Sequence, residues 1–260
     1  MIPPFARRIA RNLLQRTGYA ALPSGKLDDL RRHAAQGEKA ANLGMIPDER
    51  LRDALALLPH SQSQLNQDLF VLHTLGWKRG GYFVEFGATD GKTLSNTWLL
   101  ETRFGWTGVL AEPAQVWRQA IQASGRTARL EFDCVWSASG ETLTFNETDW
   151  AELSTIAAFE SADSHVRTAA RRYAVDTVSL VDLLDRHEAP AIVDYLSIDT
   201  EGSEYEILAA FDFARYEFRC ITVEHNFSDK REAIRSLLVG HGYQRVHEAL
   251  SQFDDWYVRA

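Results

Sequence analysis

The chain has 260 residues, of which 45% are hydrophobic and 25% charged, and it carries a formal net charge of −8. A chain of this length can bury a substantial core, so we expect a single α/β domain with an extension. The negative charge counts against nucleic acid as a partner, because nucleic acids bind basic surfaces. No apolar run approaches the ~20 residues that span a bilayer, and the first residues lack the apolar segment of a secretory signal. These features predict a cytoplasmic protein.

Residues 1–60 are predicted to form an N-terminal helical extension, followed by the main domain at residues 61–260. Residues 1–20 contain four arginines and no acidic residue, and their apolar residues recur at helical spacing. Further helices are predicted over residues 26–43 and 48–58. The basic helix could contact an anionic membrane surface or an acidic partner. It could equally pack on the protein itself or on a second subunit, and we favour this second interpretation.

The most informative stretch is a short apolar run, Tyr82 to Phe86, that ends in a turn with glycines at both ends, Gly87 and Gly91. The run predicts a buried strand, and a helix is expected after the turn, with Ser95 or Asn96 as its N-cap. Strand, glycine turn and helix together form the nucleotide site of open α/β sheets. The turn lacks the Gly-Lys-Ser/Thr of a P-loop and the third glycine of a dinucleotide fingerprint. Its Glu-x-Gly-x-x-x-Gly spacing instead resembles the first motif of S-adenosylmethionine-dependent methyltransferases.

An acidic residue ends the second predicted strand, at Glu112, followed by Pro113. It lies 25 positions after Gly87, near the spacing at which α/β nucleotide sites hold ribose hydroxyls. A carboxylate can accept hydrogen bonds from both hydroxyls at once. The other interpretation is a surface acid before a helix that begins at Pro113. We favour ribose binding.

A third strand is predicted over residues 129–135, and its end should lie under the base of a nucleotide cofactor. Asp133 and Cys134 are therefore candidates beside an adenine ring, with Asp133 as an acceptor for the exocyclic amine. Cys134 and Cys220 both lie in strand-like runs, so we expect buried thiols rather than a disulfide. Residues 146–176 are polar and are interpreted as an irregular insertion on the substrate side.

Two later strands also end in acidic groups. The run at residues 192–198 precedes Asp199 and Glu201, and the run ending at Glu224 precedes His225. Asp199 could act as a general base or hold the cationic end of a cofactor, and His225 is a second candidate base because its usual pKa lies near neutrality. Glu201 could instead sit in the first turn of a helix, where negative charge is favourable. Asp199, Glu201, Glu224 and His225 are also weak candidates for a divalent metal site, which we do not expect.

The end of the chain contains a predicted helix over residues 229–240 and two strands over 243–250 and 255–258. A terminal pair of strands is typical of the methyltransferase sheet, whose last strand inserts antiparallel, and not of a dehydrogenase. A helix over residues 61–75 is expected to lead into the first strand and to cover the cofactor.

Taken together, residues 61–258 resemble the FkbM-type family of S-adenosylmethionine-dependent methyltransferases. The resemblance rests on the glycine turn, on Glu112-Pro113, and on three further motifs: Ser63-Gln64-x-x-Gln67-Asp68, Ser95-Asn96-Thr97 and Asp199-Thr200-Glu201-Gly202-Ser203-Glu204. It implies a class I methyltransferase fold, Rossmann-like, with a mostly parallel seven-stranded sheet and an antiparallel C-terminal hairpin. The implied reaction is O-methylation of a hydroxyl on a sugar, glycan or related metabolite.

The motifs, the strand ends and the resemblance give one set of candidate site residues. The catalytic candidates are Asp199, His225 and Glu201. The candidates for contact with S-adenosylmethionine are Glu85, Phe86, Gly87, Thr89, Asp90, Gly91, Asn96, Glu112, Pro113, Asp133, Cys134 and Asp199. Two other classes of protein remain open. One is an oxidoreductase that binds NAD through the same turn and Glu112, and the other is a non-catalytic binding protein that kept the fold.

Overall fold

The computed structural model describes residues 39, 41–160 and 169–260 of the chain. The chain divides into two compact units, Met1–Ala41 and Asn42–Ala260, and the larger unit contains all the strands of the described residues. The predicted basic helix over residues 1–20 and nearly all of the helix over 26–43 lie outside the described residues. No helix among the described residues is long and apolar enough to cross a membrane.

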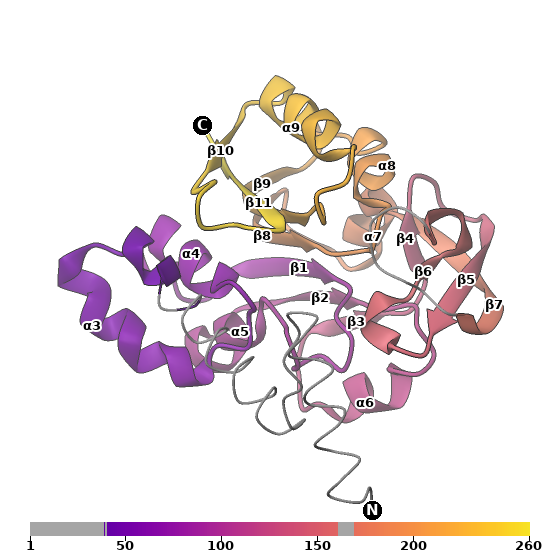
Figure 1. Ribbon diagram of the computed structural model, residues 1–260, viewed down its shortest axis with the longest axis horizontal. Helices are drawn as coiled ribbons and strands as arrows, with labels where there is room; N and C mark the ends of the chain where they lie inside the picture. Colours follow the sequence, from indigo (N-terminus) through magenta and orange to yellow (C-terminus); the bar gives the residue numbers. More distant parts are fainter. Residues whose placement is uncertain (1–38, 40, 161–168) are drawn as a thin grey trace, which may run out of the picture. The chain divides into compact units, whose positions relative to one another are not determined.

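The described residues form a twisted seven-stranded sheet with the strand order β3-β2-β1-β8-β9-β11-β10 (Figure 1). The strands are parallel except for β11, which inserts antiparallel between β9 and β10. This arrangement confirms the predicted class I methyltransferase fold with its C-terminal antiparallel hairpin. The strands span Tyr82–Phe86 (β1), Thr107–Ala111 (β2), Arg129–Glu131 (β3), Ile192–Ile198 (β8), Glu217–Glu224 (β9), Tyr243–Val246 (β10) and Asp254–Arg259 (β11).

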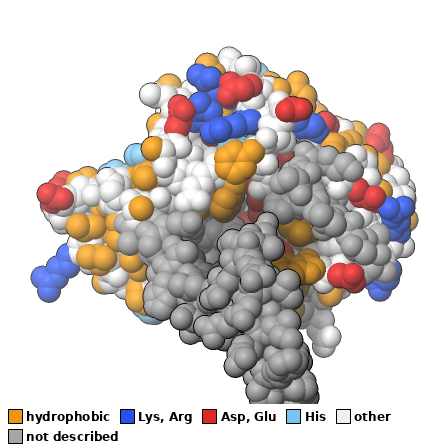
Figure 2. All heavy atoms as spheres, viewed as in Figure 1, with side chains coloured by type: hydrophobic (Ala, Val, Ile, Leu, Met, Phe, Trp, Pro, Cys, Tyr) orange, Lys and Arg blue, Asp and Glu red, His pale blue; other side chains and the backbone are white. Residues whose placement is uncertain are grey.

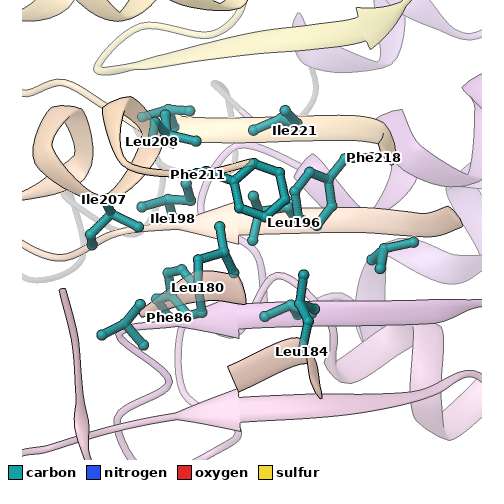
Figure 3. Packing of buried hydrophobic residues seen from close by; sticks show 14 of the residues in the cluster. Phe86, Leu180, Leu184, Leu196, Ile198, Ile207, Leu208, Phe211, Phe218 and Ile221 are labelled. Atoms are coloured by element: carbon teal, nitrogen blue, oxygen red, sulfur yellow. The ribbon is translucent and has the colours of Figure 1, made fainter. Parts of the chain in front are cut away.

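Helices cover both faces of the sheet, because the central strands alternate large apolar side chains between the two faces. Val84 and Phe86 belong to one hydrophobic cluster with α7, α8 and α9, and Figure 3 shows Phe86 beside Leu180 of α7. Phe83 belongs to the cluster on the other face, with α4, α5 and α6. Charged side chains of both signs gather over α9 (Figure 2). The helices span Asp48–Leu57 (α3), Gln67–Thr74 (α4), Trp98–Phe104 (α5), Arg118–Ala123 (α6), Leu180–Arg186 (α7), Glu204–Ala209 (α8) and Arg231–Gly240 (α9).

Residues 42–60 were predicted to belong to the N-terminal extension, but in the structure they are part of the larger unit. They contain the short 3-10 helices η1 (Leu43–Met45) and η2 (Leu58–His60) on either side of α3. Ala54 of α3 and the buried residues of η1 join the hydrophobic cluster that contains α4. The boundary therefore lies at residues 41 and 42, because apolar burial and not helical pattern decides which segments form one unit.

A second, smaller sheet departs from the sequence-based prediction. The predicted third strand over residues 129–135 is broken after Glu131, whose carboxylate accepts the N–H groups of Phe132 and Asp133. The chain then enters a four-stranded accessory sheet of order β4-β7-β5-β6. Much of the stretch at residues 146–176, predicted to be irregular, belongs to this sheet. Its elements are β4 (Cys134–Trp136), β5 (Thr142–Thr148), η3 (Ala151–Leu153), β6 (Thr155–Ile156), η4 (Ala157–Phe159) and β7 (Ala169–Ser179).

Candidate functional site

A cavity of about 260 Å³ lies at the carboxyl edge of the central strands, close to the lower end of the usual range for small-molecule sites. The segments after β1, β2, β8 and β9 and the start of β11 contribute to its walls, and the accessory sheet forms one side. Parallel strands bring their carboxyl ends to one edge of the sheet, so four acidic residues predicted from strand ends converge there: Glu112, Asp199, Glu201 and Glu224.

The segment after β1 is held by Glu85, the acid of the glycine motif. Its carboxylate accepts the backbone N–H of Asn96 at 2.6 Å, and it also accepts the hydroxyls of Ser95 and Thr97. Glu85 is 3% exposed and reaches the cavity wall. Glu85, a predicted cofactor contact, therefore fixes the segment Ser95 to Thr97 beside the cavity.

Beneath the same loop lies Arg126, which the sequence analysis missed. Its guanidinium donates to the Gly91 carbonyl at 2.7 Å, to Thr97 Oγ1 at 2.8 Å and to the Glu101 carboxylate at 2.6 Å. The Arg126 side chain is 1% exposed and lies over the Phe83 ring, 5.5 Å from its centroid. No local motif marks Arg126, because its partners lie 25 to 35 residues away.

Backbone conformation and chain packing both require the two glycines of the turn. Gly87 has a φ of 71°, and a Cβ there would overlap the carbonyl oxygen of Asp199. Gly91 has a φ of 78°, and a Cβ there would lie 3.0 Å from the side chain of Ile121 in α6. Both positions need glycine because neighbouring protein atoms occupy the space.

Several predicted cofactor residues do line the cavity, and their chemistry fits S-adenosylmethionine. Asn96 Oδ1 is buried in the wall without a hydrogen-bond partner among the described residues, and it suits the ammonium group of the methionine part. Glu112 suits the ribose hydroxyls, and Cys134 offers a weakly polar surface for the adenine. The predicted residues in the wall are Glu85, Phe86, Gly87, Thr89, Asn96, Glu112, Pro113, Cys134 and Asp199.

Glu112 is buried, and its carboxylate accepts the N–H groups of Thr89 and Ala114, each at 2.8 Å. Burial raises the pKa of Glu112 to about 7, although these two hydrogen bonds act in the opposite direction. Ribose hydroxyls would favour the ionised form further. Glu112 therefore holds its loop in place and can still accept from a ligand, since each carboxylate oxygen has two lone pairs.

Three other predicted cofactor residues lie outside the described cavity wall. Asp90 closes the turn on itself by accepting the N–H groups of Lys92 and Thr93. Gly91 packs against α6. Asp133 accepts from Arg186 Nη1 at 2.8 Å, because the break after β3 turns its side chain toward α7. Of the two residues predicted to lie beside the adenine, Asp133 and Cys134, Cys134 lies in the described cavity wall. Cys134 and Cys220 are both buried free thiols.

Three acidic side chains meet where β8 and β9 end: Asp199, Glu201 and Glu224. One carboxylate oxygen from each lies within 4.8 Å of the others. Burial, and then the charge of Glu201, hold the pKa of Asp199 well above its usual range. Burial, and then the charge of Asp199, raise the pKa of Glu224 in the same way, and the two side chains are hydrogen-bonded to each other. A hydrogen bond between two carboxyl groups requires a proton on one of them, and together with Glu201 the pair could alternatively hold a cation.

His225 lies outside this group and outside the described cavity wall. Its Nδ1 accepts the N–H of Phe227 at 2.9 Å, so the proton resides on Nε2, which lies 3.1 Å from the Asp254 carbonyl oxygen. Burial lowers the pKa of His225. Both ring nitrogens are occupied in the neutral form, so His225 is placed to hold β11 against the end of β9 and not to accept a substrate proton.

Asp254 and most of the accessory wall were not predicted from the sequence. Asp254 lies opposite Glu224 in the sheet register, lines the cavity and accepts from Gln67 Nε2 at 2.8 Å. Because β11 is antiparallel, its first residue shares an edge with the last residues of the parallel strands. A search for acids at strand ends alone overlooks it. The accessory wall comes from Phe145, Ala151, Glu152, Leu153, Ser154 and Ile156.

Comparison with known proteins gives one family. Residues 85–252 match the methyltransferase FkbM domain, which is more than half of the chain. No curated protein matches the chain.

Solved structures with similar folds are distant in sequence. Precorrin-6y C5,15-methyltransferase from Geobacter metallireducens is 13% identical, with 74% of this chain and 84% of that chain covered and a TM-score of 0.40. The CurJ carbon methyltransferase is 12% identical, with 93% of this chain and 72% of that chain covered and a TM-score of 0.39. TrmK of M. capricolum, solved with S-adenosyl-homocysteine, is 11% identical, with 73% of this chain and 66% of that chain covered and a TM-score of 0.36.

The domain match begins at Glu85, includes the glycine turn, and continues through the acidic cluster to Gln252. The seven-stranded sheet and the cavity at its carboxyl edge agree with it. The chain therefore belongs to the FkbM family of S-adenosylmethionine-dependent methyltransferases.

Proposed function

We propose that this protein is an O-methyltransferase that acts on a hydroxyl group of a sugar, a glycan or a related metabolite. The observation that supports it best is the acidic group formed by Asp199, Glu201 and Glu224, which lies in the cavity wall together with the candidate cofactor residues. S-adenosylmethionine supplies a methyl group bound to a positively charged sulfur, and the hydroxyl oxygen of the acceptor attacks the carbon of this methyl group. The chain then has to bind both molecules, align them, and remove the hydroxyl proton.

Asp199 is our candidate for the general base. It is the residue directly after β8, it lies in the cavity wall, and burial raises its pKa and so increases its affinity for a proton. Glu224 is hydrogen-bonded to Asp199, so it can take up or release the proton between them when Asp199 loses or gains a proton. We assign this role to Asp199 and not to His225, the other candidate base, because both ring nitrogens of His225 hydrogen-bond to backbone groups.

Two exposed aromatic residues support a sugar as the acceptor. Trp150 is 74% exposed and directly precedes the wall residue Ala151, while Phe227 is 72% exposed and directly follows the wall residue Asn226. Aromatic faces pack well on the C–H bonds of a sugar ring, and carboxylates accept hydrogen bonds from its hydroxyls. An NAD-dependent oxidoreductase is less consistent with the family match, and a purely non-catalytic role leaves the acidic group without a purpose.

The test is methyl transfer from labelled S-adenosylmethionine to a panel of methyl glycosides and free sugars, followed by mass spectrometry. We expect at least one acceptor to gain a single methyl group on oxygen. Asp229→Asn serves as the matched control for Asp199→Asn, since Asp229 is an exposed carboxylate outside the described wall. Binding of S-adenosylmethionine without transfer to any sugar, and transfer to a carbon or nitrogen nucleophile instead, would contradict the proposal.

A further inference from the structure

The loop after β8 carries two members of the acidic group and has an uncommon backbone. Glu201 has a φ of 58°, in the left-handed region that residues with a side chain rarely adopt. Such a conformation persists only where the surrounding structure holds it, and it concentrates at functional sites. The contacts around Glu201 therefore decide where its carboxylate lies.

Glu204 holds this loop from the side of α8. Its Oε1 accepts the backbone N–H of Thr200 and of Gly202, each at 3.0 Å, and the Thr200 hydroxyl at 2.9 Å. Glu204 is 4% exposed. The N–H groups on both sides of Glu201 are thus fixed by one buried carboxylate at the start of the helix.

Thr155 holds the same loop from the opposite side, the accessory sheet. Its hydroxyl donates to the Glu201 carbonyl oxygen at 3.0 Å, with the Thr200 carbonyl oxygen at 3.4 Å. Thr155 is 1% exposed, lies in β6, and pairs with Asn146 of β5. Its neighbours Ser154 and Ile156 line the cavity. The Thr155 hydroxyl therefore joins the wall of the accessory sheet to the acidic loop.

We propose that Thr155 is a positioning residue, which holds the left-handed backbone of Glu201 so that the Glu201 carboxylate stays beside Asp199 and Glu224. The inference rests on the proposed function, because it assigns the accessory sheet a part in arranging the acidic group that receives the acceptor hydroxyl. Without the Thr155 hydroxyl, the peptide after Glu201 keeps the hydrogen bond of the Gly202 N–H but loses the one to its carbonyl oxygen, and the Glu201 backbone can relax toward the right-handed region. The Glu201 carboxylate would then leave the group.

Valine and serine separate this role from simple packing. Thr155→Val keeps the branched shape of the side chain and removes the hydroxyl, whereas Thr155→Ser keeps the hydroxyl and removes a methyl group. A packing role predicts that serine is the more harmful change, and a positioning role predicts that valine is. Thr155→Ala is the smaller second variant, to be used if the valine protein does not fold.

The first experiment follows the side-chain carboxyl carbons of Asp199 and Glu224 by NMR during a pH titration of the full chain. The like charges that face this pair come from Glu201, Glu204 and Asp254. In Thr155→Val the titration of the pair should move to lower pH, since the nearest like charge has moved away, and in Thr155→Ser it should match the wild type. In a Glu201→Gly background, Thr155→Val should cause no further shift. A valine variant that titrates like the wild type would overturn the inference.

The second experiment measures methyl transfer on the sugar acceptor identified among the methyl glycosides and free sugars. We expect kcat to fall about tenfold in Thr155→Val, with the KM for S-adenosylmethionine unchanged, and to recover in Thr155→Ser. If the wild-type protein transfers no methyl group, the proposed function fails, while the titration still decides whether Thr155 holds Glu201. Equal losses of kcat in the valine and serine variants would contradict the positioning role.

Discussion

Two groups of three charged residues lie close to the cavity, and they are built in opposite ways. In the first group, the Arg126 guanidinium donates to Glu101 and also to Ser95 and Thr97, whose hydroxyls in turn donate to Glu85. Asp199 and Glu224 hydrogen-bond to each other, and no ion pair joins either of them to a basic side chain in the described part of the chain. The first group is complete within the protein, whereas the second keeps capacity to bind a proton.

The difference shows which buried charges support the fold and which serve chemistry. A buried ion pair with its hydrogen bonds satisfied is costly to break from one side, because the remaining charge has no partner. Neighbouring carboxylates without a cation respond to burial with raised pKa values, and that is the property a general base at neutral pH requires. We expect substitutions in the two groups to separate stability from turnover.

The largest expected effect is on turnover in Asp199→Asn. Loss of the base should lower kcat about a hundred- to ten-thousand-fold, since general base catalysis contributes about that much. The variant should melt at or above the wild-type temperature, because it removes a buried acid from a like-charged group. Steady-state kinetics and thermal unfolding measure both, with Asp229→Asn as the control. A variant that keeps its turnover would remove Asp199 from the mechanism.

The next effect is on stability, in Arg126→Met. Methionine keeps much of the apolar contact with Phe83, but Glu101 loses its cationic partner inside the protein. The free energy of unfolding should fall by about 3–5 kcal/mol. Arg129→Met is the matched control, because the Arg129 side chain is 53% exposed and its ion pair with Glu188 lies at the surface. That change should cost less than about 1 kcal/mol. Urea unfolding of the two variants decides the comparison, and similar losses would contradict the assigned role.

A smaller effect is expected on the pH dependence of cofactor binding. The pKa of Glu112 is raised from 4.5 to about 7, and ribose hydroxyls donate to the ionised form. The affinity for S-adenosylmethionine should therefore rise about tenfold between pH 6 and pH 8 and then level off. Glu112→Gln should remove this rise. Calorimetric titration at several pH values measures it, with NAD as the control ligand. A pH-independent affinity in the wild type would show that Glu112 does not contact the cofactor.

Glu112 should also affect the free energy of unfolding, in the opposite direction: its contribution falls as the pH rises. Because the folded pKa lies above the unfolded value, the folded protein binds this proton more tightly than the unfolded chain does. The contribution of Glu112 to stability is then fully present below about pH 4.5 and is lost as the pH rises through about 7. Glu112→Gln should weaken the decline of stability between these pH values, as unfolding in urea would measure.

The smallest effect is expected from removal of divalent metal. Asp199 and Glu224 hydrogen-bond to each other, and metal binding would have to displace the proton between them. We expect EDTA to leave the rate of methyl transfer unchanged, and added Mg²⁺ to leave it unchanged as well. Loss of activity in EDTA that Mg²⁺ or Mn²⁺ restores would assign the acidic group to a cation instead.

Acids at strand ends could be predicted from the sequence because their placement follows from topology alone. Parallel strands end at one edge, so Glu112, Asp199 and Glu224 had to face the same cavity once their strands were recognised. The same reasoning did not reach Asp254, since β11 runs in the opposite direction and places its first residue at that edge. The hydrogen-bond partners of the His225 ring could not be predicted in this way either, because they come from the following turn and from β11.

The sequence by itself determined the fold, through apolar strands, glycine turns and the terminal pair of strands, because these signals are local and periodic. Only the tertiary structure decided the partners of each charge. Arg126 beneath the cofactor loop and Thr155 beside Glu201 act across 25 to 46 residues, and no local pattern encodes such contacts. The physical reason is that hydrogen bonds and burial depend on which surfaces meet, and this is settled when the sheet, the helices and the accessory strands pack together.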